Sequence, residues 1–201
     1  MQKALILTVA VLTVLSCKSE AMIRPYASAK LAYTDLKIDN GVSDDNEDGI
    51  SFSVSYGASF NTIRTEFELS RVSVDFKYEY SDASYIVREK DTLTNTSFMV
   101  NTFMDIPTKS IVIPYLGVGI GVGVNSVDVG LSVYDSSDTY LGKISADATK
   151  SKFTYQAMAG IAFELDRNFD FDVGYKYVNY GNIEGLKASA NNISVGIRYN
   201  F

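Results

Sequence analysis

Carboxylates and a guanidinium alternate along one short segment, where Arg64, Glu66 and Glu68 stand two residues apart. Such a trio could act as an acid and base pair in a solvent-accessible cleft. In an extended strand, however, residues two apart share one face. We therefore interpret these charges as one side of a strand that packs an interior, and not as a catalytic centre.

The acidic segment 44–49 is a second candidate, because it reads Asp-x-Asn-x-Asp-Gly like the start of a calcium loop. That loop requires a bidentate Glu at its twelfth position, but Ser55 stands there. We expect a solvated acidic loop that holds divalent ions at most diffusely. Specific calcium binding remains the alternative.

The composition removes several kinds of chemistry. The 201 residues include no His, and the single Cys is Cys17. His is the commonest general base and the commonest zinc ligand. The net charge of −6 argues against nucleic acid as a partner, because phosphate binding needs a basic surface. We therefore predict no catalytic residue, no metal site and no cofactor.

The first 21 residues have the features of a secretory signal peptide. Lys3 precedes an apolar stretch over 4–15, and Ser19 and Ala21 supply small residues at the −3 and −1 positions of a cleavage site. We predict cleavage after Ala21 and a single domain over 22–201. Residues 14–17 also loosely match a lipoprotein signal, so lipidation of Cys17 is the alternative.

Alternation with a period of two is the main pattern of the remaining chain, and it indicates strands with two different faces. Eight segments show it, over 24–38, 50–60, 63–80, 97–106, 112–124, 153–165, 169–177 and 193–201. In two of them the apolar phase shifts, near 34–35 and near 70–71, and for the second we expect a β-bulge. Between 117 and 123 four glycines fall on one face, which predicts a crowded interior.

The connections between these segments alternate in length. Those over 39–49, 81–95, 126–151 and 181–191 are long, and those near 61–62, 107–110 and 166–168 are short. A transmembrane barrel has this asymmetry. We predict an all-β fold, an eight-stranded antiparallel transmembrane β-barrel with short periplasmic turns and long extracellular loops.

The bulky apolar face of each strand is expected to meet lipid, because an eight-stranded barrel has room inside only for side chains. Charges on the opposite face would fill the lumen, namely Arg24, Lys30, Arg64, Glu66, Glu68, Asp105, Glu164, Asp170, Asp172, Lys176 and Arg198. Aromatic residues near strand ends predict interfacial girdles, namely Tyr26, Tyr33, Tyr78, Tyr80, Tyr177, Tyr180, Tyr199 and Phe201. A secreted β-sandwich with a solvated polar face is the alternative.

Five segments together resemble the opacity-protein and OmpA-like family of eight-stranded outer-membrane barrels, also described as a porin-family barrel domain. They are residues 24–33, 63–68, 113–121, 171–177 and 196–201. The resemblance implies a bacterial outer membrane, cell-surface loops that often serve adhesion, and a C-terminal strand ending in Phe201 that the barrel-insertion machinery reads.

We therefore expect a non-enzymatic barrel with a structural or surface-interaction role, in adhesion or envelope integrity. Barrel enzymes that act on lipid A rely on a His and Ser pair, and this chain has no His. The expected partners are outer-membrane lipid, lipopolysaccharide, the insertion machinery and host or envelope proteins that meet loops 39–49, 81–95, 126–151 and 181–191. A small channel for ions or hydrophobic solutes is the alternative function.

Overall fold

The computed structural model describes residues 23–39, 44–81, 85–135, 140–183 and 186–201, and side chains over 23–37, 47–74, 92–126, 132, 149–181 and 187–201. The predicted signal peptide over 1–21 lies outside these residues. Eight strands make up the fold: β1 (Arg24–Asp39), β2 (Asp44–Phe60), β3 (Ile63–Ser81), β4 (Tyr85–Asp105), β5 (Val112–Asp135), β6 (Tyr140–Glu164), β7 (Phe169–Ile183) and β8 (Leu186–Asn200).

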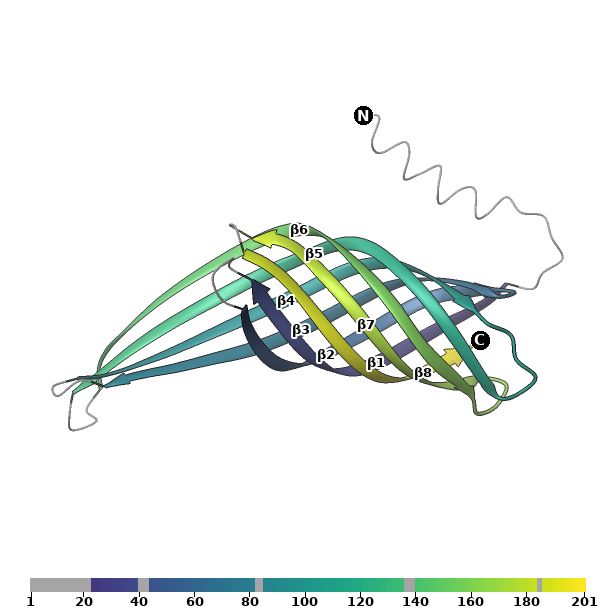
Figure 1. Ribbon diagram of the computed structural model, residues 1–201, viewed down its shortest axis with the longest axis horizontal. Helices are drawn as coiled ribbons and strands as arrows, with labels where there is room; N and C mark the ends of the chain where they lie inside the picture. The colour runs from purple at the N-terminus through teal and green to yellow at the C-terminus, as the bar shows by residue number, and fades with distance from the viewer. Residues whose placement is uncertain (1–22, 40–43, 82–84, 136–139, 184–185) are drawn as a thin grey trace, which may run out of the picture.

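The strands form one closed antiparallel barrel in sequence order, as Figure 1 shows. The pairing of β1 with β8, from Tyr26 opposite Asn200 to Asp39 opposite Lys187, completes the ring. Closure leaves the barrel wall with no unpaired strand edge, which is the condition for crossing lipid with strands. The predicted fold class is confirmed. No helix in the described ranges is long and apolar enough to span a membrane.

One end of the barrel carries tight connections. Asn61 and Thr62 join β2 to β3, and Asn61 adopts a left-handed φ of 56°, a conformation that Asn tolerates better than most residues. The turn after β6 is fixed by Asp166, whose Oδ1 accepts hydrogen bonds from the backbone N–H groups of Asn168 and Phe169. These short turns agree with the predicted periplasmic end.

At the other end the strands run much further than the sequence patterns predict. Most of the segments 39–49, 81–95, 126–151 and 181–191 are strand and not loop. The predicted strand ends were wrong because a strand was expected to end where its outward positions were no longer apolar. Among the side chains described just beyond the lipid the faces exchange roles, with polar residues outside and apolar residues inside.

The phase changes near 34–35 and 70–71 are this exchange. Pairing of β3 with β2 and with β4 runs through Ser70 and Arg71 without a register shift, so the expected β-bulge is absent there. Below this point Leu69 is exposed and Glu68 buried, whereas above it Arg71 is exposed and Val72 buried. The backbone alternates evenly while the solvent outside changes from hydrocarbon to water.

The extensions are unequal. Strands β3, β4, β5 and β6 stay paired out to Ser81, Tyr85, Asp135 and Tyr140, whereas β1 and β2 end at Asp39 and Asp44. Pairing between β2 and β3 stops at Ile50 opposite Ser73, and pairing between β6 and β7 stops at Tyr155 opposite Asn179. The barrel therefore opens into a long four-stranded blade, β3–β6, and a shorter lobe, β7-β8-β1-β2, as Figure 1 shows.

Candidate functional site

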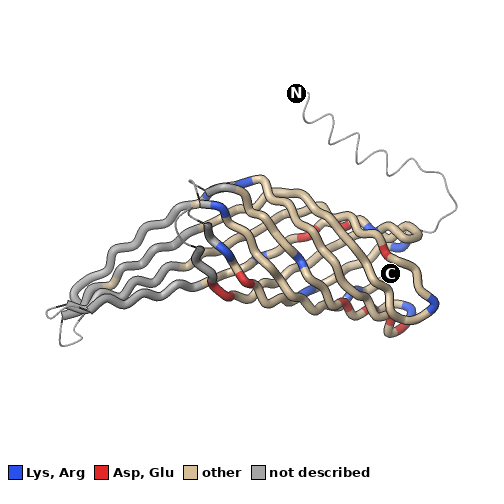
Figure 2. Tube along the Cα trace, viewed as in Figure 1, with Lys and Arg blue, Asp and Glu red and all other residues tan. Residues whose placement is uncertain are grey.

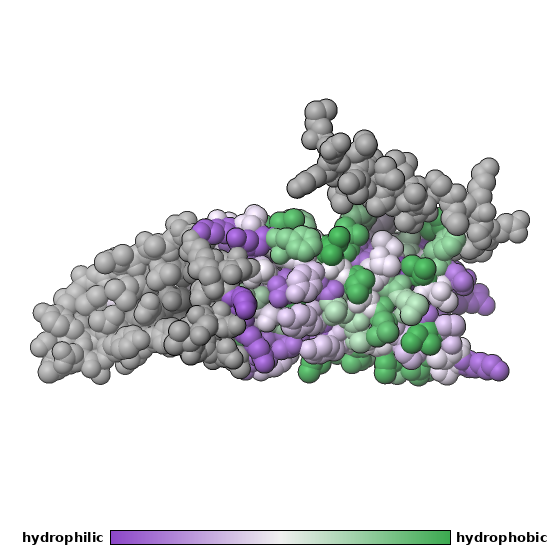
Figure 3. Space-filling view, turned by 45° about the horizontal axis from the view of Figure 1, so that its top comes forward, coloured by the Kyte–Doolittle hydropathy of each residue, from purple (hydrophilic) through white to green (hydrophobic). Residues whose placement is uncertain are grey.

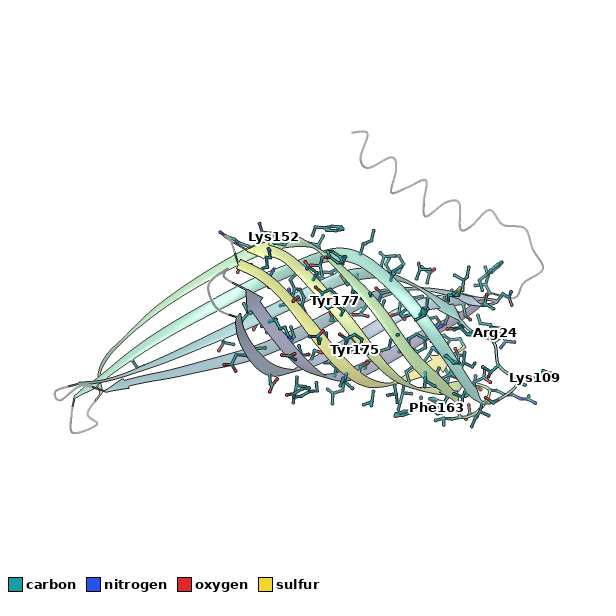
Figure 4. All side chains as sticks on the ribbon, viewed as in Figure 1. Arg24, Lys109, Lys152, Phe163, Tyr175 and Tyr177 are labelled. Carbon is teal, nitrogen blue, oxygen red and sulfur yellow. The ribbon has the colours of Figure 1, made fainter. Side chains whose placement is uncertain are left out.

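The outer wall carries an apolar belt that Figure 3 shows as a hydrophobic band with hydrophilic residues at its ends. Neighbouring residues differ sharply in exposure: Phe153 is 63% exposed and Thr154 fully buried, and Ile193 is 64% exposed and Asn192 2%. The belt confirms that bulky apolar side chains point outward. In Figure 4, Arg24 and Lys109 lie at the short-turn end and Lys152 lies toward the other end of the belt.

The belt ends at a polar row that we call the upper border. On each strand it is the first polar residue that follows the outward apolar positions on the extended side, namely Asp35, Asp48, Arg71, Thr96, Ser126, Ser151, Asn179 and Asn191. Figure 2 shows charged residues toward both ends of the belt. Arg71 is the only cation among these eight border residues.

Two buried ion pairs occupy the short-turn half of the lumen. Arg64 Nε donates to Asp105 Oδ2 at 2.7 Å, and Arg198 Nη2 lies 2.7 Å from Asp170 Oδ2. The two guanidinium carbons lie 6.0 Å and 5.6 Å from the ring centroid of Tyr26, so both cations contact this one ring. Buried charges are tolerated when paired and hydrogen-bonded in this way.

The Arg64 guanidinium also contacts the rings of Phe103 and Tyr115, at 4.8 Å and 5.0 Å from their centroids. Those two rings meet edge to face at 5.6 Å. Cation–π contacts of this kind gain strength when water is excluded. The aromatic pair therefore fills the lumen cross-section beside the ion pairs.

Two carboxylates lie at the barrel centre and share an amide. Asn101 Nδ2 donates to Glu66 Oε1 at 3.2 Å and to Glu68 Oε2 at 3.0 Å. Tyr26 Oη donates to Glu66 Oε2 at 2.9 Å, and Lys176 Nζ pairs with Glu68 Oε1 at 2.8 Å. The charges predicted to pack an interior do so, and Asn101 and Tyr26 supply hydrogen-bond donors that the spacing within β3 does not reveal.

Glycines on β5 make room for this network. A Cβ at Gly117 would overlap the ring of Phe103, and a Cβ at Gly119 would overlap the side chain of Asn101. The four glycines between 117 and 123 therefore leave room for large side chains of β4. This agrees with the crowded interior that the glycines predicted.

The extended end of the lumen is closed by apolar packing. Seven buried residues from β1, β3, β7 and β8 form one cluster there, namely Leu36, Val72, Val74, Val178, Tyr180, Ala188 and Ala190. Just below it, Thr34 Oγ1 donates to Asn192 Oδ1 at 2.6 Å. We call the seven-residue cluster the apolar cap. It joins the base of the blade to the shorter lobe.

The empty space inside is divided. A cavity of about 20 Å³ lies beside Lys30, Glu68 and Lys176, which is room for about one water molecule. A bowl of about 1210 Å³ opens at the short-turn end, with Arg64 and Arg198 among its lining residues. The side-chain layers described above lie between the bowl and the extended end.

The structure brings together most of the charges predicted for the lumen. Arg64, Glu66, Glu68, Asp170, Asp172 and Arg198 are buried, and Lys30, Asp105 and Lys176 are half-buried. Arg24 and Glu164 also face inward, since both line the bowl, but they are exposed to solvent at its mouth. They stand at strand ends, where the wall no longer encloses them.

Two aromatic residues predicted for the girdles lie inside instead. Tyr26 is fully buried among the ion pairs, and Tyr180 belongs to the apolar cap. Their even positions on β1 and β7 put them on the lumen face, a parity that the sequence already contained. Tyr33, Tyr199 and Phe201 are exposed as expected, whereas the side chains of Tyr78 and Tyr80 lie outside the described set.

The calcium candidate at 44–49 forms the first part of β2, paired with β1 from Asp39 opposite Asp44 to Thr34 opposite Gly49. It is thus a strand and not the expected open loop. Among the described residues no group of three or more acidic, His or Cys side chains is arranged to hold a metal ion. The side chains of 44–46 lie outside that description, so diffuse cation binding stays a prediction.

A closed barrel, an apolar belt and a polar lumen together define an outer-membrane β-barrel. Residues 4–201 match the family model described as outer membrane protein beta-barrel domain, and the chain belongs to that family. Its place is the bacterial outer membrane, among lipid and lipopolysaccharide.

Two curated relatives are distant. The outer membrane protein PagN of Salmonella typhimurium is 24% identical over 57% of this chain and 53% of its own length. The opacity protein opA65 of Neisseria gonorrhoeae is 22% identical over 66% of this chain and 64% of its own length. The chain thus spans less than two thirds of each relative, and the likeness supports the resemblance to opacity proteins.

Among solved structures, Neisserial surface protein A superimposes with a TM-score of 0.62 at 21% identity, over 88% of this chain and 97% of that chain. At that identity the likeness shows the shared barrel fold.

Proposed function

We propose that this protein is a non-enzymatic surface-interaction barrel, whose extended strands present a contact surface outside the cell for adhesion or for envelope partners. The observation that carries the proposal is the continuation of β3–β6 beyond the upper border. From Arg71 to Ser81, β3 alone adds about 33 Å of strand. A barrel built only to cross lipid has no need of that length.

The filled lumen supports the same role over a channel. Ion pairs and the Phe103–Tyr115 pair occupy one level, and the apolar cap occupies another. Opening a path would require breaking buried salt bridges, which is costly because each leaves an unpaired charge. The resemblance to opacity proteins points in the same direction, since that family often serves adhesion.

The test is adhesion of a non-adherent Gram-negative host that expresses the chain. A shortened variant lacks 77–88 and 130–145, so that both blade hairpins close nearer the membrane. We expect the full chain to raise attachment to epithelial cells and the shortened one to lose it, while both show the gel shift on boiling that marks a folded barrel. Equal attachment by the two folded proteins would overturn the proposal.

The channel alternative has its own measurement. Purified protein in planar bilayers should give no stable unit conductance steps. Reproducible steps that disappear on boiling the protein would favour a small pore for ions or solutes.

Residues 1–21 are proposed to be a signal peptide that is removed on export. Mass spectrometry of the protein from outer membranes should give a chain that starts at Met22. A chain that starts at a lipid-modified Cys17 would instead establish the lipoprotein alternative.

A further inference from the structure

The lipid-facing belt is hollowed across β2, β3 and β4. A groove of about 430 Å³ is lined there by the outward side chains of Val54, Tyr56, Phe67, Leu69, Phe98 and Val100. These residues form two cross-strand rows, Tyr56–Phe67–Val100 and Val54–Leu69–Phe98. Larger rings stand beside smaller aliphatic side chains, so the wall has a depression in contact with hydrocarbon.

Arg71 stands directly above this groove. It belongs to the next row, opposite Phe52 on β2 and Thr96 on β4. Its exposed side chain points outward on the same face as Phe67 and Leu69. From Arg71 to Phe67 the strand covers about 13 Å, so the groove lies within the outer half of a hydrocarbon layer about 30 Å thick.

Arg71 has no ion-pair partner among the described side chains. Its neighbours on the outer face are apolar or hydroxyl-bearing, and Ser73 Oγ lies 3.2 Å from Thr94 Oγ1 in the row above. The next acidic residue along β3 beyond Arg71 is Asp75, whose backbone lies about 13 Å further along the strand. This differs from the lumen, where Arg64 and Arg198 are both paired.

We propose that this groove and Arg71 form a binding site for one phosphorylated glycolipid of the outer leaflet. An acyl chain lies in the groove, and a headgroup phosphate accepts hydrogen bonds from the Arg71 guanidinium. A guanidinium binds phosphate through two parallel donors, and the acyl chain places that phosphate at the upper border. The site is independent of the proposed surface-interaction role, because it faces the membrane and not the extracellular blade.

Native mass spectrometry of the purified full-length protein tests the site, with bisphosphorylated lipid A as the probe. The wild type should retain one lipid A. The Arg71→Gln variant should bind it about tenfold more weakly, the usual effect of losing one charge-assisted hydrogen bond. Lipid A without phosphates should bind the wild type equally weakly, with no further loss in Arg71→Gln.

The groove has a separate variant. Val100→Phe adds a ring to the depression and should weaken binding of lipid A with or without phosphates. Val118→Phe, on β5 outside the groove, and Lys109→Gln, an exposed cation at the short-turn end, are the matched controls and should leave binding unchanged. The gel shift on boiling verifies that every variant is folded.

Any one of four results would overturn the proposal. Unchanged affinity in Arg71→Gln would show that Arg71 does not contact a phosphate. Equal weakening by Val118→Phe would show that the lipid binds anywhere on the belt. Equal retention of phosphatidylglycerol, or displacement of lipid A by millimolar inorganic phosphate, shows a general anion contact and no glycolipid site.

Discussion

At the scale of single residues, the interior depends on matched partners more than on apolar burial. Asn101 bridges Glu66 and Glu68, and Gln156 Nε2 donates to Asn101 Oδ1 at 2.7 Å. Each buried polar group lowers the free energy of the folded state only while its partner is present. Single changes in the lumen should therefore be more damaging than their size suggests.

The Arg64–Asp105 pair gives the clearest residue-scale prediction. Arg64→Met should lower the free energy of unfolding by about 1–3 kcal/mol, because Asp105, whose side chain is only 18% exposed, is left without its cation at the floor of the bowl. The double change with Asp105→Leu should recover part of that loss. Urea titration of the refolded protein in lipid vesicles measures both.

The exposed turn residue Lys109 provides the control for this pair, and Lys109→Met should leave the unfolding midpoint unchanged. A double variant as unstable as the sum of the two single variants would contradict coupling between Arg64 and Asp105.

At the scale of the strands, one unbroken ladder passes through two environments. On β5 the outward positions change from Val118, Ile120 and Val122 to Ser126. No bulge in this stretch adjusts the backbone, since the pairing with β4 and β6 is regular there. The border between lipid and water is therefore a property of side-chain type alone.

The upper border predicts that a Lys introduced on the outward face of β5 destabilises the barrel by an amount that depends on its position. Val118→Lys should destabilise the folded barrel by about 2–4 kcal/mol, as expected near the bilayer midplane, and Ser126→Lys by about 0–1 kcal/mol. Equilibrium unfolding in vesicles distinguishes them. Equal costs at the two positions would place the membrane elsewhere on the wall.

The apolar cap gives a second prediction at this scale. Val74→Asp puts a charge into the cluster with Leu36 and Tyr180, so the base of the blade should open while the membrane ladder stays closed. Limited proteolysis of intact cells should then cut within 75–91, with the gel shift on boiling retained.

Ser73→Asp, on the solvent face next to Val74, is the control for the cap and should not increase cleavage. Protection of Val74→Asp to the same extent as wild type would show that the cap does not hold the blade.

At the scale of the whole molecule, the two ends of the chain complete the barrel together. Phe201 N donates to Pro25 O at 3.0 Å, and the Phe201 ring packs edge to face on Tyr199 at 5.1 Å. The last strand thus supplies the closing seam with β1, and its terminal aromatic residues face lipid.

Deleting Phe201 should reduce assembly in cells more than folding in vitro, because the family resemblance implies that the insertion machinery reads the terminal strand, whereas the isolated protein loses few contacts. The heat-modifiable fraction of membrane protein, compared with the fraction refolded in detergent, measures the difference. An equal loss of folded protein in cell membranes and in detergent would show that the role of Phe201 is purely structural.

The sequence alone determined the strand count, the inside-out faces and the lumen charges, because a period of two fixes which residues share a face. The even positions of Tyr26 and Tyr180 also placed these residues on the lumen face, although their nearness to strand ends suggested an interfacial girdle. Only the tertiary structure decided where each strand ends, since the polar extensions satisfy the same ladder in water as the belt does in lipid. Partners such as Asp105 for Arg64, the groove below Arg71 and the apolar cap arise from register between strands, which the spacing within one strand does not specify.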